Sequence, residues 1–218
     1  SGQVLVDGQD LKSIVRERGS LPPEDAYDVA IQAAAGLEAI HAQGVVHRDL
    51  KPSNLMRDQA GQVRILDFGV ARLASAHEGS ATATALALGT PDYMSPEQAL
   101  GRPVDPRTDI YALAVVVFEL FTGELPFHGD TPLATMLKHL HEPPPLDGPA
   151  AQRIPPLLVP VLRRGMAKDP ANRFAGAAAM REALLGALGA GAESEQLTPI
   201  ATPTHRALAP APPIPGRR

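Results

Sequence analysis

The sequence has no cysteine and no tryptophan, and aromatic residues make up only 4% of its 218 residues. The absence of cysteine excludes a disulfide framework, a thiol nucleophile and a zinc site built from cysteine. Scarce aromatic side chains argue against base stacking, and a net charge of −4 argues against a basic surface for nucleic acid. We therefore expect no nucleic-acid partner.

Long apolar runs are also absent. The longest, residues 112–118, is too short to span a bilayer and predicts a buried helix. Residues 1–9 lack the basic region and apolar core of a signal peptide. We expect a cytoplasmic protein with no membrane segment in this chain. The glycine-rich phosphate-binding patterns G-x-G-x-x-G and G-x-x-x-x-G-K do not occur either.

Apolar residues recur at helical spacing along much of the chain, and proline or glycine marks several ends of these stretches. The pattern predicts helices over residues 11–18, 21–41, 109–122, 133–141, 157–167 and 176–188. Two short strands are predicted at residues 55–56 and 63–66, around a turn at residues 59–62.

Two stretches lack periodicity. Residues 67–96 form a long segment, and loops of that length inside a compact domain are usually functional or disordered. After Leu188 the composition changes, because residues 193–218 carry six prolines and no amphipathic pattern. We predict a disordered tail or linker, rich in Pro, Ala and Thr, over residues 189–218.

Three motifs occur in a fixed order. Residues 47–54 read His-Arg-Asp-Leu-Lys-Pro-Ser-Asn, residues 67–69 read Asp-Phe-Gly, and residues 89–97 read Gly-Thr-Pro-Asp-Tyr-Met-Ser-Pro-Glu. They resemble the catalytic loop, the magnesium-binding triplet and the end of the activation segment of eukaryotic-like serine/threonine protein kinases. The Ser-Pro-Glu-Gln sequence at residues 95–98 resembles bacterial members of that family.

The resemblance implies a mainly helical fold, namely the large C-terminal lobe of a protein kinase with a short β hairpin. The kinase region would cover residues 1–188, with an activation segment at residues 67–97. The implied activity is transfer of the γ-phosphate of ATP to serine and threonine hydroxyls of protein substrates, with ATP and Mg²⁺ as cofactors.

Phosphoryl transfer needs positioning and charge compensation more than covalent help, which explains the residue types. By resemblance, Asp49 meets the substrate hydroxyl and Lys51 offsets charge on the moving phosphoryl group. Asn54 and Asp67 offer the hard oxygen ligands that magnesium prefers, and the resemblance gives them that role. Lys51 and Thr90 match residues that are typical of serine/threonine kinases and not of tyrosine kinases, so the resemblance is to the former.

Arg48 precedes the catalytic aspartate, as in kinases that are switched by phosphorylation of the activation segment. A phosphate adds about two negative charges that an arginine can order. Thr82 and Thr84 are the best candidate phosphosites by position, with Ser75 and Ser80 weaker.

Other motif residues have supporting roles by resemblance. His47, Phe68 and Gly69 would brace the site. Asp109 is favourable at a helix N-terminus, and in the family the matching aspartate anchors the backbone of the catalytic loop. The resemblance further pairs Glu97 with the arginine of a late motif at residues 169–174, Arg173, so that Arg173→Ala should be more destabilising than a surface change.

The sequence departs from the family at its start. A complete kinase has a glycine-rich loop, a strand lysine and a helix glutamate before the hinge, and none of these can be placed before Gly8. Residues 4–11 resemble the hinge and the helix after it. The N-terminal lobe would then belong to a longer chain, be supplied by a partner chain, or be truly lacking. We predict activity near zero for residues 1–218 alone.

Two further alternatives belong to other classes. The helical lobe could serve as a non-catalytic docking module, which an N-lobe sequence upstream in the reading frame would argue against. Small-molecule phosphotransferases share an aspartate loop of similar style, but they lack the block at residues 89–97 and the Arg173 motif. Arg57 is a minor departure, since the family usually has an apolar residue there.

Overall fold

We analysed a computed structural model of the chain, which describes residues 8–66 and 91–196, with side chains to residue 191. Its helices and strands are β1 (Gly8–Asp10), α1 (Leu11–Arg18), α2 (Pro23–His41), β2 (Leu55–Asp58), β3 (Val63–Ile65), α5 (Pro96–Ala99), α6 (Pro106–Thr122), α7 (Pro132–His141), α8 (Val159–Gly165) and α9 (Ala177–Gln196). Short 3-10 turns lie at Pro52–Asn54, Ala150–Arg153 and Pro170–Asn172.

Helix α6 lies at the centre of the described part, and every residue from Thr108 to Thr122 is buried. The sequence explains both ends. The Asp105 side chain accepts from the backbone N–H of Arg107 as the N-cap, and Gly123 ends the helix in the left-handed conformation. A helix that is apolar all round is stable only when other elements cover it on every side.

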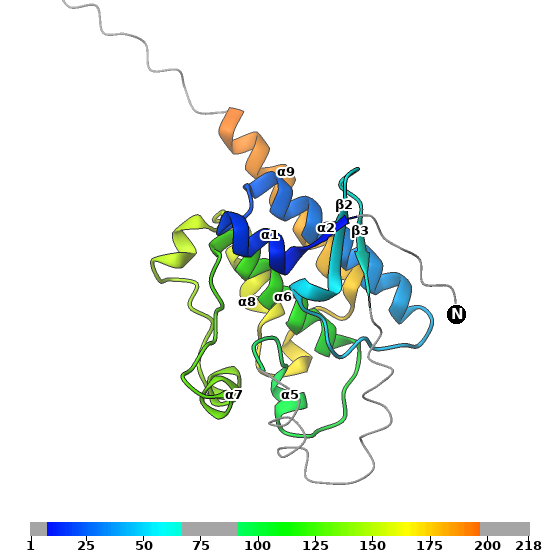
Figure 1. Cartoon of the computed structure of the whole chain (residues 1–218), viewed down its shortest axis with the longest axis vertical. Coiled ribbons are helices and arrows are strands. Elements are labelled where there is room, and N and C mark those ends of the chain that lie inside the picture. The colour runs from blue at the N-terminus through cyan, green and yellow to red at the C-terminus, as the bar shows by residue number, and fades with distance from the viewer. Residues whose placement is uncertain (1–7, 67–90, 197–218) are drawn as a thin grey trace, which may run out of the picture.

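Helices α2 and α9 lie side by side, and both pack against α6 (Figure 1). Helix α2 begins with Pro23 and carries Glu24 and Asp25 in its first turn. These negative side chains are favourable there because the N-terminus is the positive end of the helix dipole. Its buried stripe is mostly small and apolar, so that neighbouring backbones approach closely: Ala26, Val29, Ala30, Ala33, Ala34 and Leu37. These three helices form the core of the lobe.

The sheet has three antiparallel strands in the order β1-β2-β3 and lies beside α2 (Figure 1). The predicted hairpin is present as β2 and β3. Strand β1 was not predicted, because Gly8, Gln9 and Asp10 carry no pattern of strand-forming side chains. It pairs through its backbone, with Gly8 opposite Asp58 and Asp10 opposite Met56.

The helices expected from periodicity are all present, with ends that differ by up to three residues except at the end of α9. Helix α5 was not expected, because it has only four residues. Helix α9 continues to Gln196, whereas the predicted helix ended at residue 188. The assignment of residues 189–218 to a tail or linker stays a prediction.

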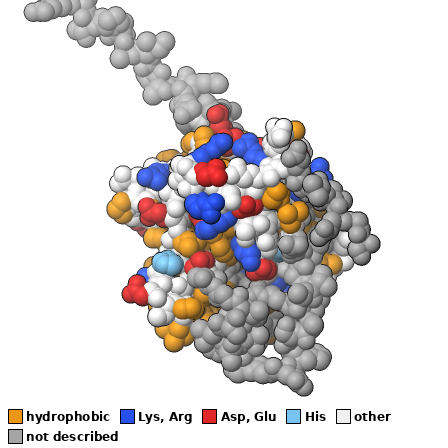
Figure 2. Space-filling model, viewed as in Figure 1, with side chains coloured by type: hydrophobic (Ala, Val, Ile, Leu, Met, Phe, Trp, Pro, Cys, Tyr) orange, Lys and Arg blue, Asp and Glu red, His pale blue; other side chains and the backbone are white. Residues whose placement is uncertain are grey.

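The surface carries charges of both signs. On the face in Figure 2, basic and acidic side chains are interspersed over α1 and α2. Hydrophobic side chains gather over α7, where Leu133 and Leu137 are each nearly half exposed. Within the described ranges, no helix has the length and apolar character needed to cross a membrane.

Candidate active site

A single buried carboxylate holds the start of the loop at residues 47–54. Asp109, in the first turn of α6, is completely buried. Its Oδ2 accepts from the backbone N–H of His47 at 2.8 Å, and its Oδ1 accepts from that of Arg48 at 2.8 Å. His41 Nε2, at the end of α2, lies 2.8 Å from Oδ2. The central helix therefore fixes the backbone just before Asp49.

His47 connects this loop to the end of strand β3. Its ring is buried, and Nδ1 accepts from the backbone N–H of Asp49 at 3.3 Å. Since Nδ1 accepts, Nε2 carries the hydrogen, and it donates to the carbonyl of Leu66 at 3.1 Å. His47 thus ties the position of Asp49 to the residue just before Asp67.

Asp49, Lys51 and Asn54 lie together. Lys51 Nζ is 2.9 Å from Asp49 Oδ2, and both side chains are about one-third exposed, at 38% and 34%. Asn54 Nδ2 donates to the backbone carbonyl of Asp49 at 2.8 Å and approaches Asp49 Oδ2 at 3.5 Å. A partly exposed carboxylate and ammonium therefore lie beside a buried amide, and a substrate can reach the two charged groups.

The amide of Asn54 has a defined orientation. A carbonyl only accepts, so the bond to the carbonyl of Asp49 fixes Nδ2 on that side and turns Oδ1 away from it. No hydrogen bond among the described residues uses this Oδ1, which leaves it suited to a hard cation such as Mg²⁺. In residues 8–66 and 91–191, no three His, Asp or Glu side chains gather as ligands for a metal.

Several expected site residues lie outside the described ranges. They are the second expected magnesium ligand with its two neighbours, the two candidate phosphosites, and the threonine before Pro91: Asp67, Phe68, Gly69, Thr82, Thr84 and Thr90. Their roles stay predictions.

Arg173 forms a fully satisfied ion pair with Glu97. Its Nη1 and Nη2 donate to the two carboxylate oxygens at 2.7 and 2.8 Å. The other three N–H groups of the guanidinium donate to backbone carbonyls of Ala167, Arg107 and Lys168. Burial raises the pKa of Glu97, but hydrogen bonds from Arg173 and Thr108 outweigh it, so that the pKa lies below its ordinary value.

A second buried carboxylate lies deeper in α6. Glu119 pairs with Lys12 Nζ of α1 at 2.8 Å and accepts from the hydroxyl of Tyr93. Burial, and then the negative charge of Glu119, raises the pKa of Tyr93, so the phenol stays a donor. The block at residues 91–97 is thus anchored to the core by both Tyr93 and Glu97.

Sequence reasoning missed three contributors to this arrangement. His41 was not singled out, because its bond to Asp109 has no local signal in the sequence. Ser95 and Gln98 form a capping box at the start of α5. Their Ser-x-x-Gln spacing is a recognised helix-start pattern and could have revealed the helix.

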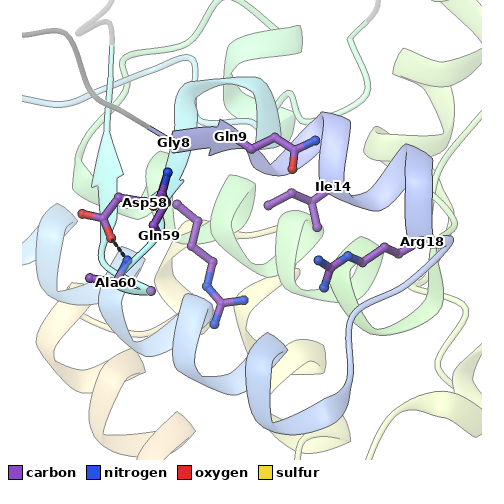
Figure 3. A pocket seen from close by; sticks show the side chains of 9 residues that line it. Gly8, Gln9, Ile14, Arg18, Asp58, Gln59 and Ala60 are labelled. Atoms are coloured by element: carbon purple, nitrogen blue, oxygen red, sulfur yellow. Dashed lines mark hydrogen bonds between the residues drawn. The ribbon is translucent and has the colours of Figure 1, made fainter.

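A hollow of about 600 Å³ lies away from these residues, between β1, α1 and the turn from β2 to β3 (Figure 3). Arg18, from the last turn of α1, points into it, and none of the expected site residues lines it. Arg57, the departure noted in the sequence, also lines it. Arg57 Nη2 pairs with Asp25 Oδ1 on α2 at 2.7 Å, which explains how a charge is accommodated on this strand.

Comparisons with known proteins define the class. Residues 4–185 match the family model described as the protein kinase domain. A crystal structure of Rad53 residues 1–466 in complex with AMP-PNP has a TM-score of 0.63 and 27% identity, covering 81% of this chain and 44% of that one. The chain belongs to the protein kinase family, which confirms the predicted family and its mainly helical fold.

The curated relatives are bacterial serine/threonine kinases. Serine/threonine-protein kinase PknB of Mycobacterium leprae is 41% identical over 180 residues, which are 83% of this chain and 29% of the relative. Serine/threonine-protein kinase PksC of Streptomyces coelicolor is 41% identical over 184 residues, 83% of this chain and 33% of the relative. The chain thus spans about a third of the length of these relatives.

Proposed function

We propose that this chain contributes the catalytic loop of a serine/threonine protein kinase, which transfers the γ-phosphate of ATP to serine and threonine hydroxyls of proteins. The observation that carries the proposal is the grouping of Asp49, Lys51 and Asn54, with the backbone just before Asp49 fixed by Asp109. The likeness to bacterial serine/threonine kinases supports the substrate class.

Each side chain has a role that its chemistry permits. Asp49 orients the substrate hydroxyl and accepts its proton as the oxygen attacks. Lys51, paired with the same carboxylate, offsets negative charge on the transferring group. Asn54, with Asp67, would hold Mg²⁺, which when bound to ATP neutralises phosphate charge. Phosphoryl transfer at this site is therefore a matter of position and charge.

The proposal extends to regulation and location. Thr82 and Thr84 are the proposed phosphosites, since they lie in the activation segment and Arg48 precedes the catalytic aspartate. We place the domain in the cytoplasm, where ATP is available. Glu97, Asp109, Arg173 and His47 are proposed as structural supports of the site, in keeping with their buried hydrogen bonds.

A phosphorylation assay tests this proposal. The product of the complete reading frame and residues 1–218 alone are each incubated with ATP, Mg²⁺ and a generic protein substrate, and the phosphoamino acids are identified. We expect phosphoserine and phosphothreonine with the complete product. We expect background levels with residues 1–218, because a glycine-rich loop and its partner lysine are not in this sequence.

Phosphotyrosine as the main product would contradict the assigned substrate class. No transfer by the complete product, purified from cells and phosphorylated in its activation segment, would instead favour the docking-module alternative.

A further inference from the structure

Arg48, the residue just before the proposed catalytic aspartate, has an unfavourable backbone conformation. Its φ is 66°, and it is the one non-glycine with positive φ among the described residues. A residue with a Cβ rarely adopts this left-handed backbone conformation unless its surroundings hold it there. The peptide groups on both sides of Arg48 therefore need fixed partners.

Two such partners lie within hydrogen-bond distance of Arg48. The N–H of Arg48 donates to Asp109 Oδ1 at 2.8 Å, and its carbonyl oxygen accepts from Gln98 Nε2 at 2.8 Å. The carbonyl belongs to the peptide bond that leads into Asp49. Its direction therefore sets the direction of the Asp49 N–H, which reaches His47 Nδ1.

The amide of Gln98 is itself locked. Its Oε1 accepts from the backbone N–H and from the hydroxyl of Ser95, each at 3.1 Å. With the oxygen used on that side, the NH₂ group must face Arg48. Gln98 follows Glu97 in α5, and Glu97 is fixed by Arg173. A continuous set of bonds therefore runs from the buried ion pair to the peptide before Asp49.

We propose that Gln98 is a positioning residue for Asp49. From helix α5, Gln98 holds the carbonyl of Arg48. This bond fixes the strained turn at Arg48, and the turn sets the direction of the Asp49 carboxylate. The catalytic meaning of this position rests on the proposed function of Asp49, whereas the bond itself does not. Gln98 thereby couples helix α5 to the catalytic loop.

The substitution Gln98→Glu isolates the proposed bond. A carboxylate still accepts from both groups of Ser95, so the capping box is kept, but it cannot donate to the carbonyl of Arg48. We expect the amides of Arg48 and Asp49 to exchange with deuterium about tenfold faster, the effect of losing one hydrogen bond. Amides within α6 should keep their protection.

Gln32→Glu is the matched control. Gln32 also donates through Nε2 to a backbone carbonyl, that of Gly61 at 3.0 Å, and accepts from the N–H of Val63 at 2.9 Å. It lies on α2 beside the turn from β2 to β3. This control should leave exchange at Arg48 and Asp49 unchanged. Gln98→Met, which removes the donor without adding a charge, should accelerate exchange as Gln98→Glu does.

Exchange at Arg48 that is unchanged in both Gln98 variants would overturn the proposal. An equal loss of protection throughout α6 would also overturn it, because Gln98 would then serve general stability.

For the Gln98 variants in the complete reading frame, we expect kcat to fall about tenfold with the KM for ATP unchanged. Since exchange does not require phosphoryl transfer, a failure of the kinase assay would leave the exchange result interpretable.

Discussion

At the scale of single residues, Arg173 is held by a complete set of hydrogen bonds, with all five of its N–H groups donating. Arg173→Ala would remove the charged partner of the buried carboxylate of Glu97, which keeps a hydrogen bond from the hydroxyl of Thr108, and would remove a donor from three carbonyls. We expect it to lower the free energy of unfolding by about 3–5 kcal/mol, measured by urea denaturation. Arg163→Ala, which truncates an exposed arginine, should cost less than about 0.5 kcal/mol. Equal effects would contradict the role given to the ion pair.

His139 gives the lobe a pH dependence at the same scale. The ring is completely buried against Tyr111, and burial, with the nearby charge of Lys168, lowers its pKa to about 3. In the unfolded chain the His139 ring binds a proton near pH 6.5, whereas in the folded chain it binds one only near pH 3. Stability from this group is therefore present above pH 6.5 and is lost as the pH falls towards 3.

We expect His139→Gln to flatten the loss of unfolding free energy between pH 6.5 and pH 4, where the histidine contributes up to about 1.4 kcal/mol per pH unit. His141→Gln, at an exposed histidine of the same helix, is the control for the substitution itself. Chemical denaturation at a series of pH values measures the slope of this loss. An identical slope for wild type and His139→Gln would show that the ring is not held neutral.

At the scale of elements, the end of α6 is packed against the loop after α1. Gly123 has a φ of 76°, and a Cβ there would lie 2.1 Å from the carbonyl oxygen of Gly19. Gly44 has a similar φ of 73°, but a Cβ there would meet nothing within 4 Å. The two glycines therefore separate backbone strain from steric overlap.

We expect Gly44→Ala to cost about 1 kcal/mol of unfolding free energy, the strain alone. Gly123→Ala should cost at least about 2 kcal/mol more, because the backbone of Gly19 must also move. Thermal and urea unfolding of both variants would measure the difference. Similar losses of unfolding free energy in the two variants would contradict the close contact between Gly123 and the backbone of Gly19.

The elements show what a sequence can and cannot predict. Long helices were predicted because their apolar spacing is local, as is the stop signal Gly123 of α6, whereas the N-cap Asp105 was not recognised and the helix begins three residues before the predicted start. Strand β1 was missed because its three residues pair through their backbone with a distant strand. Helix α5 was missed because four residues hold no period, although its capping box was visible in the sequence.

At the scale of the whole molecule, the site is assembled from segments far apart in the chain. The motifs predicted which residues matter, but the bonds among them depend on tertiary packing. Asp109 reaches residues 47 and 48 across more than 60 positions, and Arg173 reaches Glu97 across 76. The bond from Gln98 to the carbonyl of Arg48 could not be predicted, since it requires the φ of Arg48 and the fold around α6.

The rate of phosphoryl transfer by Asp49→Asn tests the central claim most directly. It is measured in the complete reading frame beside Asp58→Asn, an aspartate whose carboxylate only accepts from the backbone in the turn after β2. We predict a fall of about 10²–10⁴-fold for Asp49→Asn, because the general base is removed, and little change for Asp58→Asn. Equal rates for Asp49→Asn and wild type would contradict the assignment of Asp49 as the residue that receives the substrate proton.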